Sequence, residues 1–147
     1  MSHHLVAARP EERELFCRNG LKWFAKIPAK KIRAAVKEIQ KQRAALRRAR
    51  PNSAVGKTLV AELDLAARMA EQSCRFMLWQ QAVAGGNKAA AEKMRQSGLA
   101  ELRQLSRDFN RLWPRRNKGT PEKCSPFLRW RLEDYQRGLP KLPPANL

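Results

Sequence analysis

The chain of 147 residues is long enough to form one domain with a substantial apolar core. Its 31 lysines and arginines stand against 13 aspartates and glutamates, which gives a formal net charge of +18 and a sequence pI near 11.1. The 43% share of hydrophobic residues excludes a disordered basic tail, and the lack of an apolar run of about 18 residues excludes a membrane-spanning helix.

The N-terminus and the cysteines indicate a compartment. Residues 1–5 have neither the basic start nor the apolar stretch of a secretory signal. Cys17, Cys74 and Cys124 lie far apart and are odd in number, which argues against a disulfide framework. We therefore predict a reducing, cytoplasmic location.

Apolar residues recur with helical period along nearly the whole chain, and no segment alternates as a strand does. Prolines and glycines divide the chain into predicted helices over residues 10–27, 29–50, 54–84 and 88–113, and a short one from Thr120 or Ser125 to Gly138. The sequence thus predicts an all-α fold, a compact bundle of four to five helices. We expect one domain over residues 1–138, followed by a proline-rich tail, 139–147, that is extended or disordered.

The two longest predicted helices carry the surfaces expected at the centre of such a bundle. Residues 54–84 are apolar on two sides, and 88–113 carry one continuous apolar stripe at steps of three and four. The connection at Gly85-Gly86 is short. We therefore expect these two helices to pack as a central antiparallel hairpin.

Positive charge is concentrated in two places. Residues 26–50 hold ten basic side chains and one acid, Glu38, whereas residues 54–101 hold six basic and five acidic side chains. On a helical projection one basic face spans roughly 80°, opposite an apolar face with Ile32, Val36 and Ile39. This first basic face consists of Lys30, Arg33, Lys37, Lys41 and Arg48.

A second basic face follows the helix over 88–113, where arginines recur every four residues. It consists of Arg103, Arg107, Arg111, Arg115 and Arg116. Like charges at this spacing repel, and +18 exceeds the net charge of roughly 2–8 that serves solubility in a small domain. These residues therefore predict binding to a polyanion, with nucleic acid, RNA or DNA, as the commonest one. Trp113, Trp130 and Tyr135 lie among the arginines and are candidate base-stacking residues.

No catalytic or metal-binding constellation accompanies the charge. Gly56-Lys57-Thr58 resembles the end of a P-loop, but Pro51 occupies the position of the required first glycine. The histidines, His3 and His4, are adjacent, and no cysteines are paired at zinc-binding spacing. We predict a non-catalytic protein with no metal and no cofactor.

About half of the chain, residues 59–136, carries a further pattern. It comprises Ala61–Met69, the turn at Gly85-Gly86, the segment Phe109–Lys118 and Leu132–Tyr135. This pattern resembles the C-terminal helical region of bacterial family 20 glycoside hydrolases. That family's active site holds an adjacent Asp-Glu pair on a barrel, and no Asp-Glu dipeptide occurs here. The resemblance therefore implies a non-catalytic module, and no site residues carry over.

Two functional hypotheses follow. The first is an accessory subunit that binds the nucleic-acid backbone with little sequence preference, within a larger nucleoprotein assembly with other protein subunits. The alternative is a helical protein-interaction module like the family 20 region. Attachment to an anionic membrane surface ranks last, because the apolar residues of the first basic helix are needed for the bundle.

Overall fold

The computed structural model describes residues 27–117 and 127–137. The predicted helix over residues 10–27, except for Ile27, and the predicted tail over 139–147 lie outside this part of the chain, as do Cys17 and Cys124. The described residues are all-α, as predicted, and contain no strand.

Four α-helices are present in these two ranges. They are α2 (Ala29–Leu46), α3 (Ala54–Ala84), α4 (Lys88–Leu112) and α6 (Phe127–Arg137), and a 3-10 turn, η2 (Trp113–Arg115), follows α4. The helix predicted to reach Arg50 ends at Leu46, because the backbone turns at Arg47 and Arg48, ahead of Pro51. Thr120 and Ser125, the two predicted starts of the last helix, lie outside the described residues.

Short polar side chains set the boundaries of the long helices. The Oγ of Ser53 accepts a hydrogen bond of 3.0 Å from the backbone N–H of Gly56 at the start of α3. The Oδ1 of Asn87 accepts one of 3.1 Å from Ala90 at the start of α4. Between them Gly86 has a φ of 72°, the left-handed conformation that favours glycine.

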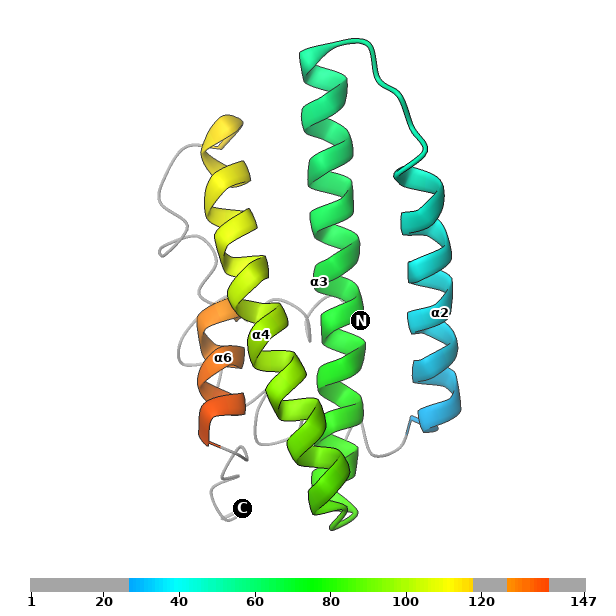
Figure 1. Ribbon diagram of the computed structural model, residues 1–147, viewed down its shortest axis with the longest axis vertical. Coiled ribbons are helices and arrows are strands. Elements are labelled where there is room, and N and C mark those ends of the chain that lie inside the picture. The colour runs from blue at the N-terminus through cyan, green and yellow to red at the C-terminus, as the bar shows by residue number, and fades with distance from the viewer. Residues whose placement is uncertain (1–26, 118–126, 138–147) are drawn as a thin grey trace, which may run out of the picture.

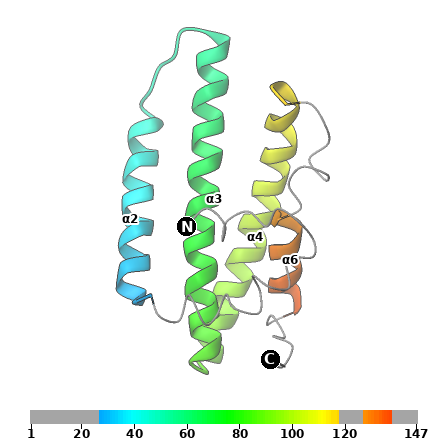
Figure 2. The ribbon, with the colours of Figure 1, turned by 180° about the vertical axis from the view of Figure 1, so that it is seen from behind.

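The helix α3 lies at the centre, with α2 on one side and α4 on the other (Figure 1). After the turn at Gly86, α4 runs back alongside α3, and α6 packs against α4. Figure 2, from behind, shows the same order with α2 and α4 on opposite sides of α3. The positions of the two basic faces follow from this order.

The core is an aromatic cluster between α3, α4 and α6. The rings of Phe76 and Tyr135 meet edge to face with centroids 5.1 Å apart, and the rings of Trp79 and Tyr135 lie 4.6 Å apart. Leu102 and Leu105 of α4 complete the cluster, and both are fully buried.

No helix within residues 27–117 or 127–137 has the length and apolar character needed to cross a membrane.

Gly98 permits the close packing of α6 on α4. A Cβ at this position would lie 2.4 Å from Cζ of Tyr135, which is far inside van der Waals contact. Tyr135 has no exposed surface and its hydroxyl accepts a hydrogen bond from Gln72, so its ring has little room to move. Glycine in the middle of α4 is therefore explained by packing.

We predict that Gly98→Ala lowers the free energy of unfolding by about 1–3 kcal/mol through overpacking, despite the gain of roughly 1 kcal/mol in helix propensity. Urea unfolding followed by tryptophan fluorescence measures the change. In the background of Tyr135→Leu the loss should shrink, because the clashing ring is gone. A Gly98→Ala protein more stable than the parent would contradict this packing argument.

Candidate nucleic-acid interface

Acidic and basic side chains are segregated between the interior and the surface. Among the described acids only Glu38 and Glu92 are exposed, whereas Glu71, Asp108 and Asp134 are buried. The described basic side chains are exposed with four exceptions, which are Arg43, Arg68, Arg95 and Arg131. The surface is therefore more positive than the composition alone implies.

The first basic face lies on the side of α2 that points away from α3. Ile32 is buried, and Val36 and Ile39 are half-buried on the same side of the helix. On the opposite side all five residues of the face are exposed, and none of their side chains makes a hydrogen bond or an ion pair with the described residues. They are Lys30, Arg33, Lys37, Lys41 and Arg48, the last of which lies in the turn after α2.

Arg43 differs from the other cations of α2 because it holds the helix to α3. Its Nε donates to Asp64 over 3.0 Å and its Nη1 to Glu71 over 2.9 Å. Glu71 also accepts hydrogen bonds from Gln40, over 2.8 Å, and from Arg75, over 2.6 Å. The charge pattern of α2 alone does not single out Arg43. The signal for its partners is the spacing of Asp64 and Glu71, seven residues apart on one face of α3.

The carboxylate of Glu71 is only 3% exposed, and opposing effects act on its pKa. Burial favours the neutral acid, but hydrogen bonds from Arg75, Gln40 and Arg43, with the charge of Arg75, outweigh it and lower the pKa below 4.5. Glu71 is therefore ionised at neutral pH. Glu101 has no such set of donors, and burial raises its pKa.

The second basic face lies on the side of α4 that points away from the core. Leu102, Leu105 and Phe109 are buried, whereas all five arginines are exposed: Arg103, Arg107, Arg111, Arg115 and Arg116. Arg115 is in η2, beyond the end of α4, so the regular spacing of four ends with Arg111. Arg103 and Arg115 have no side-chain partner among the described residues.

The remaining arginines of this second face make exposed contacts that leave most of each guanidinium free. Arg107 donates to Gln104, and Arg111 lies 3.3 Å from Asp108 with 69% of its side chain exposed. Arg116 pairs with Glu62 of α3 over 3.0 Å. Asp108 is bound more closely by Arg68, over 2.6 Å, and this hydrogen bond lowers the pKa of Asp108. The buried acid is thus compensated from α3, and the row on α4 keeps its charge.

The three candidate stacking residues differ in their surroundings. Tyr135 is 0% exposed and belongs to the core, so the structure contradicts its assignment to base stacking. Trp113 is half-buried, close in sequence to Arg115 and Arg116, and stacks on Phe109 with centroids 5.2 Å apart. The side chain of Trp130 lies outside the described part of the structure.

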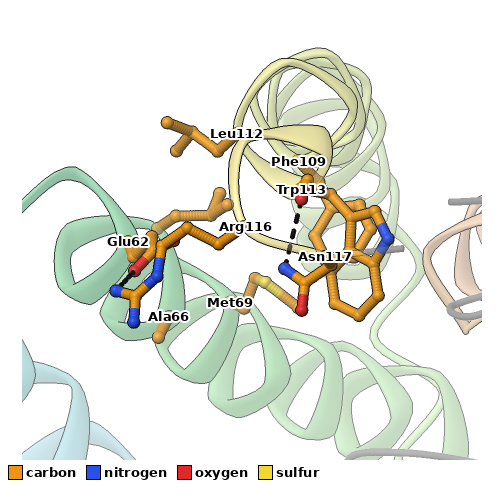
Figure 3. A pocket seen from close by; sticks show the side chains of 9 residues that line it. Glu62, Ala66, Met69, Phe109, Leu112, Trp113, Arg116 and Asn117 are labelled. Atoms are coloured by element: carbon orange, nitrogen blue, oxygen red, sulfur yellow. Dashed lines mark hydrogen bonds and ion pairs between the residues drawn. The ribbon is translucent and has the colours of Figure 1, made fainter. Parts of the chain in front are cut away.

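An open cavity of about 400 Å³ lies between α3 and α4 beside the second basic face (Figure 3). Its lining is mostly apolar, with Met69 and Ala66 on one side and Trp113 and Phe109 on another. The sequence alone does not predict this cavity, because its lining residues come from two helices that are far apart in the chain. The described residues contain no cluster of histidine, cysteine, aspartate and glutamate able to hold a metal ion.

Comparisons with known proteins found no matching family model, no matching curated protein and no matching solved structure. The resemblance of residues 59–136 to the family 20 glycoside hydrolase region therefore stays a prediction.

We predict that Glu71→Gln lowers the free energy of unfolding at neutral pH by about 1–3 kcal/mol, because Arg43 loses a buried charged acceptor. The folded pKa of Glu71 is below 4.5, so its ionised form stabilises the fold above pH 4.5. This stabilisation is lost as the pH falls through the folded pKa. The difference between parent and variant should therefore shrink in acid, as measured by urea unfolding at a series of pH values.

Glu92→Gln is the matched control. Glu92 also binds an arginine, Arg95, over 2.7 Å, but on the exposed side of α4. Exposed pairs contribute little to stability, so this variant should unfold like the parent at every pH. Equal effects of the two substitutions would contradict the special position of Glu71.

Proposed function

We propose that this protein is a small helical nucleic-acid-binding subunit that holds phosphate backbones with little sequence preference. The observation that carries the proposal is the segregation of charge, with most acids turned inward and the exposed cations gathered on two faces. Among the described residues, none of the five cations of the first face has an acidic partner, nor do Arg103, Arg107 and Arg115 of the second, whereas Arg111 and Arg116 pair with Asp108 and Glu62. Exposed lysines and arginines that lack acidic partners retain their full attraction for phosphate and release its counterions on binding.

The proposal takes the domain to be a compact bundle around the antiparallel hairpin of α3 and α4. In this arrangement the basic faces of α2 and α4 lie on opposite flanks of α3. A single straight duplex that contacts one face leaves the other free. This geometry supports a subunit of a larger nucleoprotein assembly, in which the second face holds another segment of the nucleic acid.

Arginine content and the form of the surface favour this function over the protein-interaction alternative. The face on α4 is made of arginine alone, and guanidinium groups bind phosphate in a bidentate manner. The large exposed apolar residues in the described ranges are Val55, Leu59 and Leu63, all near the start of α3. The first basic face has no aromatic residue among its members, and the large exposed apolar residues lie apart from both faces.

We predict that the double variant Arg33→Glu/Lys37→Glu weakens binding to all nucleic-acid sequences alike. The loss of two phosphate contacts should reduce the slope of log affinity against log salt concentration by roughly 1.4–1.8. Fluorescence anisotropy with labelled single- and double-stranded RNA and DNA, at salt concentrations from about 50 to 300 mM, measures both quantities.

The matched control is Lys57→Glu/Lys88→Glu, which changes the net charge equally but lies outside both basic faces. Both lysines are exposed near the first turn of a helix, where a carboxylate suits the helix dipole. Equal weakening by the two double variants would mean that only net charge acts. A parent protein whose binding vanishes at about 150 mM salt would favour the protein-interaction alternative.

A further inference from the structure

We propose that the cavity between α3 and α4 receives an unstacked base of single-stranded nucleic acid. This inference rests on the proposed function, because the arginines beside the cavity supply the phosphate contacts. It adds a preference for single strands, whose bases are free to turn away from the backbone.

The cavity has the size and lining of a site for a flat, largely apolar group. Its volume of about 400 Å³ lies within the range of roughly 300–1,000 Å³ found for small-molecule sites. Figure 3 shows Trp113 and Phe109 on one side, Leu112 at the top, and Met69 and Ala66 below. Polar groups stand only at Glu62, Arg116 and Asn117.

The aromatic pair supplies a stacking surface. The rings of Phe109 and Trp113 are nearly parallel, with an interplanar angle of 24°. Phe109 is buried and Trp113 half-buried, so the pair extends from the core to the surface. The Nε1–H of Trp113 is buried on the edge of the ring that points away from the cavity, so the ring offers an occupant its apolar surface (Figure 3).

The charges around the cavity separate a base from a phosphate. Glu62 places a carboxylate on the wall, which disfavours an anion inside even though Arg116 pairs with it over 3.0 Å. Outside, Arg115 is exposed in η2 next to Trp113 and has no side-chain partner among the described residues. A phosphate is therefore favoured at the arginines, and a neutral base is favoured in the cavity.

Hydrogen-bonding groups at the cavity remain available to an occupant. The Nδ2 of Asn117 donates to the backbone carbonyl of Trp113 over 3.1 Å, which fixes the amide and leaves its Oδ1 as an acceptor. The amide and the carboxylate are the group types that meet the polar edges of a base. An aliphatic ligand would leave them unused.

The experiment compares a labelled thymidine strand of about twelve nucleotides with an abasic strand of equal length, which has the same phosphates and no bases. We expect the full-length protein to bind the thymidine strand roughly tenfold more tightly, because base–aromatic stacking is absent from the abasic strand. Ala66→Phe, which adds a ring to the cavity from an exposed position on α3, should remove most of this preference. It should leave the affinity for the abasic strand unchanged.

Ala35→Phe is the matched control, since it adds the same ring at an exposed position of α2 and should keep the preference. Trp113→Leu should also remove the preference, and circular dichroism establishes that each variant is folded. Equal affinity of the parent for the two strands, or a preference that folded Ala66→Phe retains, would overturn the base-binding cavity and leave phosphate binding intact. Failure to bind either strand would also overturn the base-binding cavity, and the anisotropy titration with double-stranded RNA and DNA then decides whether the proposed function itself stands.

Discussion

The buried carboxylate of Glu71 fixes the position of α2, and with it the direction of the first basic face. A carboxylate that is 3% exposed is unstable without compensating partners, and Arg43, Gln40 and Arg75 all donate to it. Because Arg43 and Gln40 belong to α2, their hydrogen bonds to the buried Glu71 determine how that helix lies on α3. Ile32, Val36 and Ile39 then lie on the covered side of α2, and the basic side chains are exposed on the other. The cationic surface is thus a consequence of how an anion is buried.

A second constraint determines where the groove between α3 and α4 is filled and where it stays open. Gly98 lets Tyr135 enter the core, and Arg131 of the same helix donates to Gln72 and Ser73 of α3 over 2.8 and 2.9 Å. These contacts, with those of Tyr135 to Phe76 and Trp79, place α6 against the half of α3 nearest the turn at Gly86. Toward the other end, Met69, Phe109 and Trp113 line the cavity instead. The short helix α6 therefore makes the close contact at Gly98, and none of its residues lines the open cavity.

The helical period of the apolar residues, with the prolines and glycines between segments, was sufficient to predict the all-α fold. The predicted bounds 54–84 match α3 because Ser53 caps the start of this helix and Gly85 its end. The exposure of the seven predicted phosphate-binding side chains within α2 and α4 also followed from helical periodicity, whereas Arg48, Arg115 and Arg116 lie beyond the ends of these helices. Arg43 was not distinguished from its neighbours, since its partners Asp64 and Glu71 lie on another helix. Tyr135 was misassigned because an aromatic residue among arginines looks like a surface residue until the contact with Gly98 is known. The spacing of residues along one helix predicts which side chains share a face of that helix. It does not predict which residues of another helix they contact.

The difference between buried and exposed charges also decides what salt can reveal about this protein. Exposed cations are screened over a Debye length of about 8–10 Å at 0.1–0.15 M salt, whereas buried pairs are screened much less. The tie between Arg43 and Glu71 involves side chains that are only 15% and 4% exposed, so α2 stays attached as the salt concentration rises. Salt does screen the exposed cations of the first basic face, which include Lys30, Arg33, Lys37 and Lys41. A fall in nucleic-acid affinity with salt therefore reports loss of phosphate contacts at an intact surface, and only acid, by neutralising Glu71, would loosen the helix that carries them.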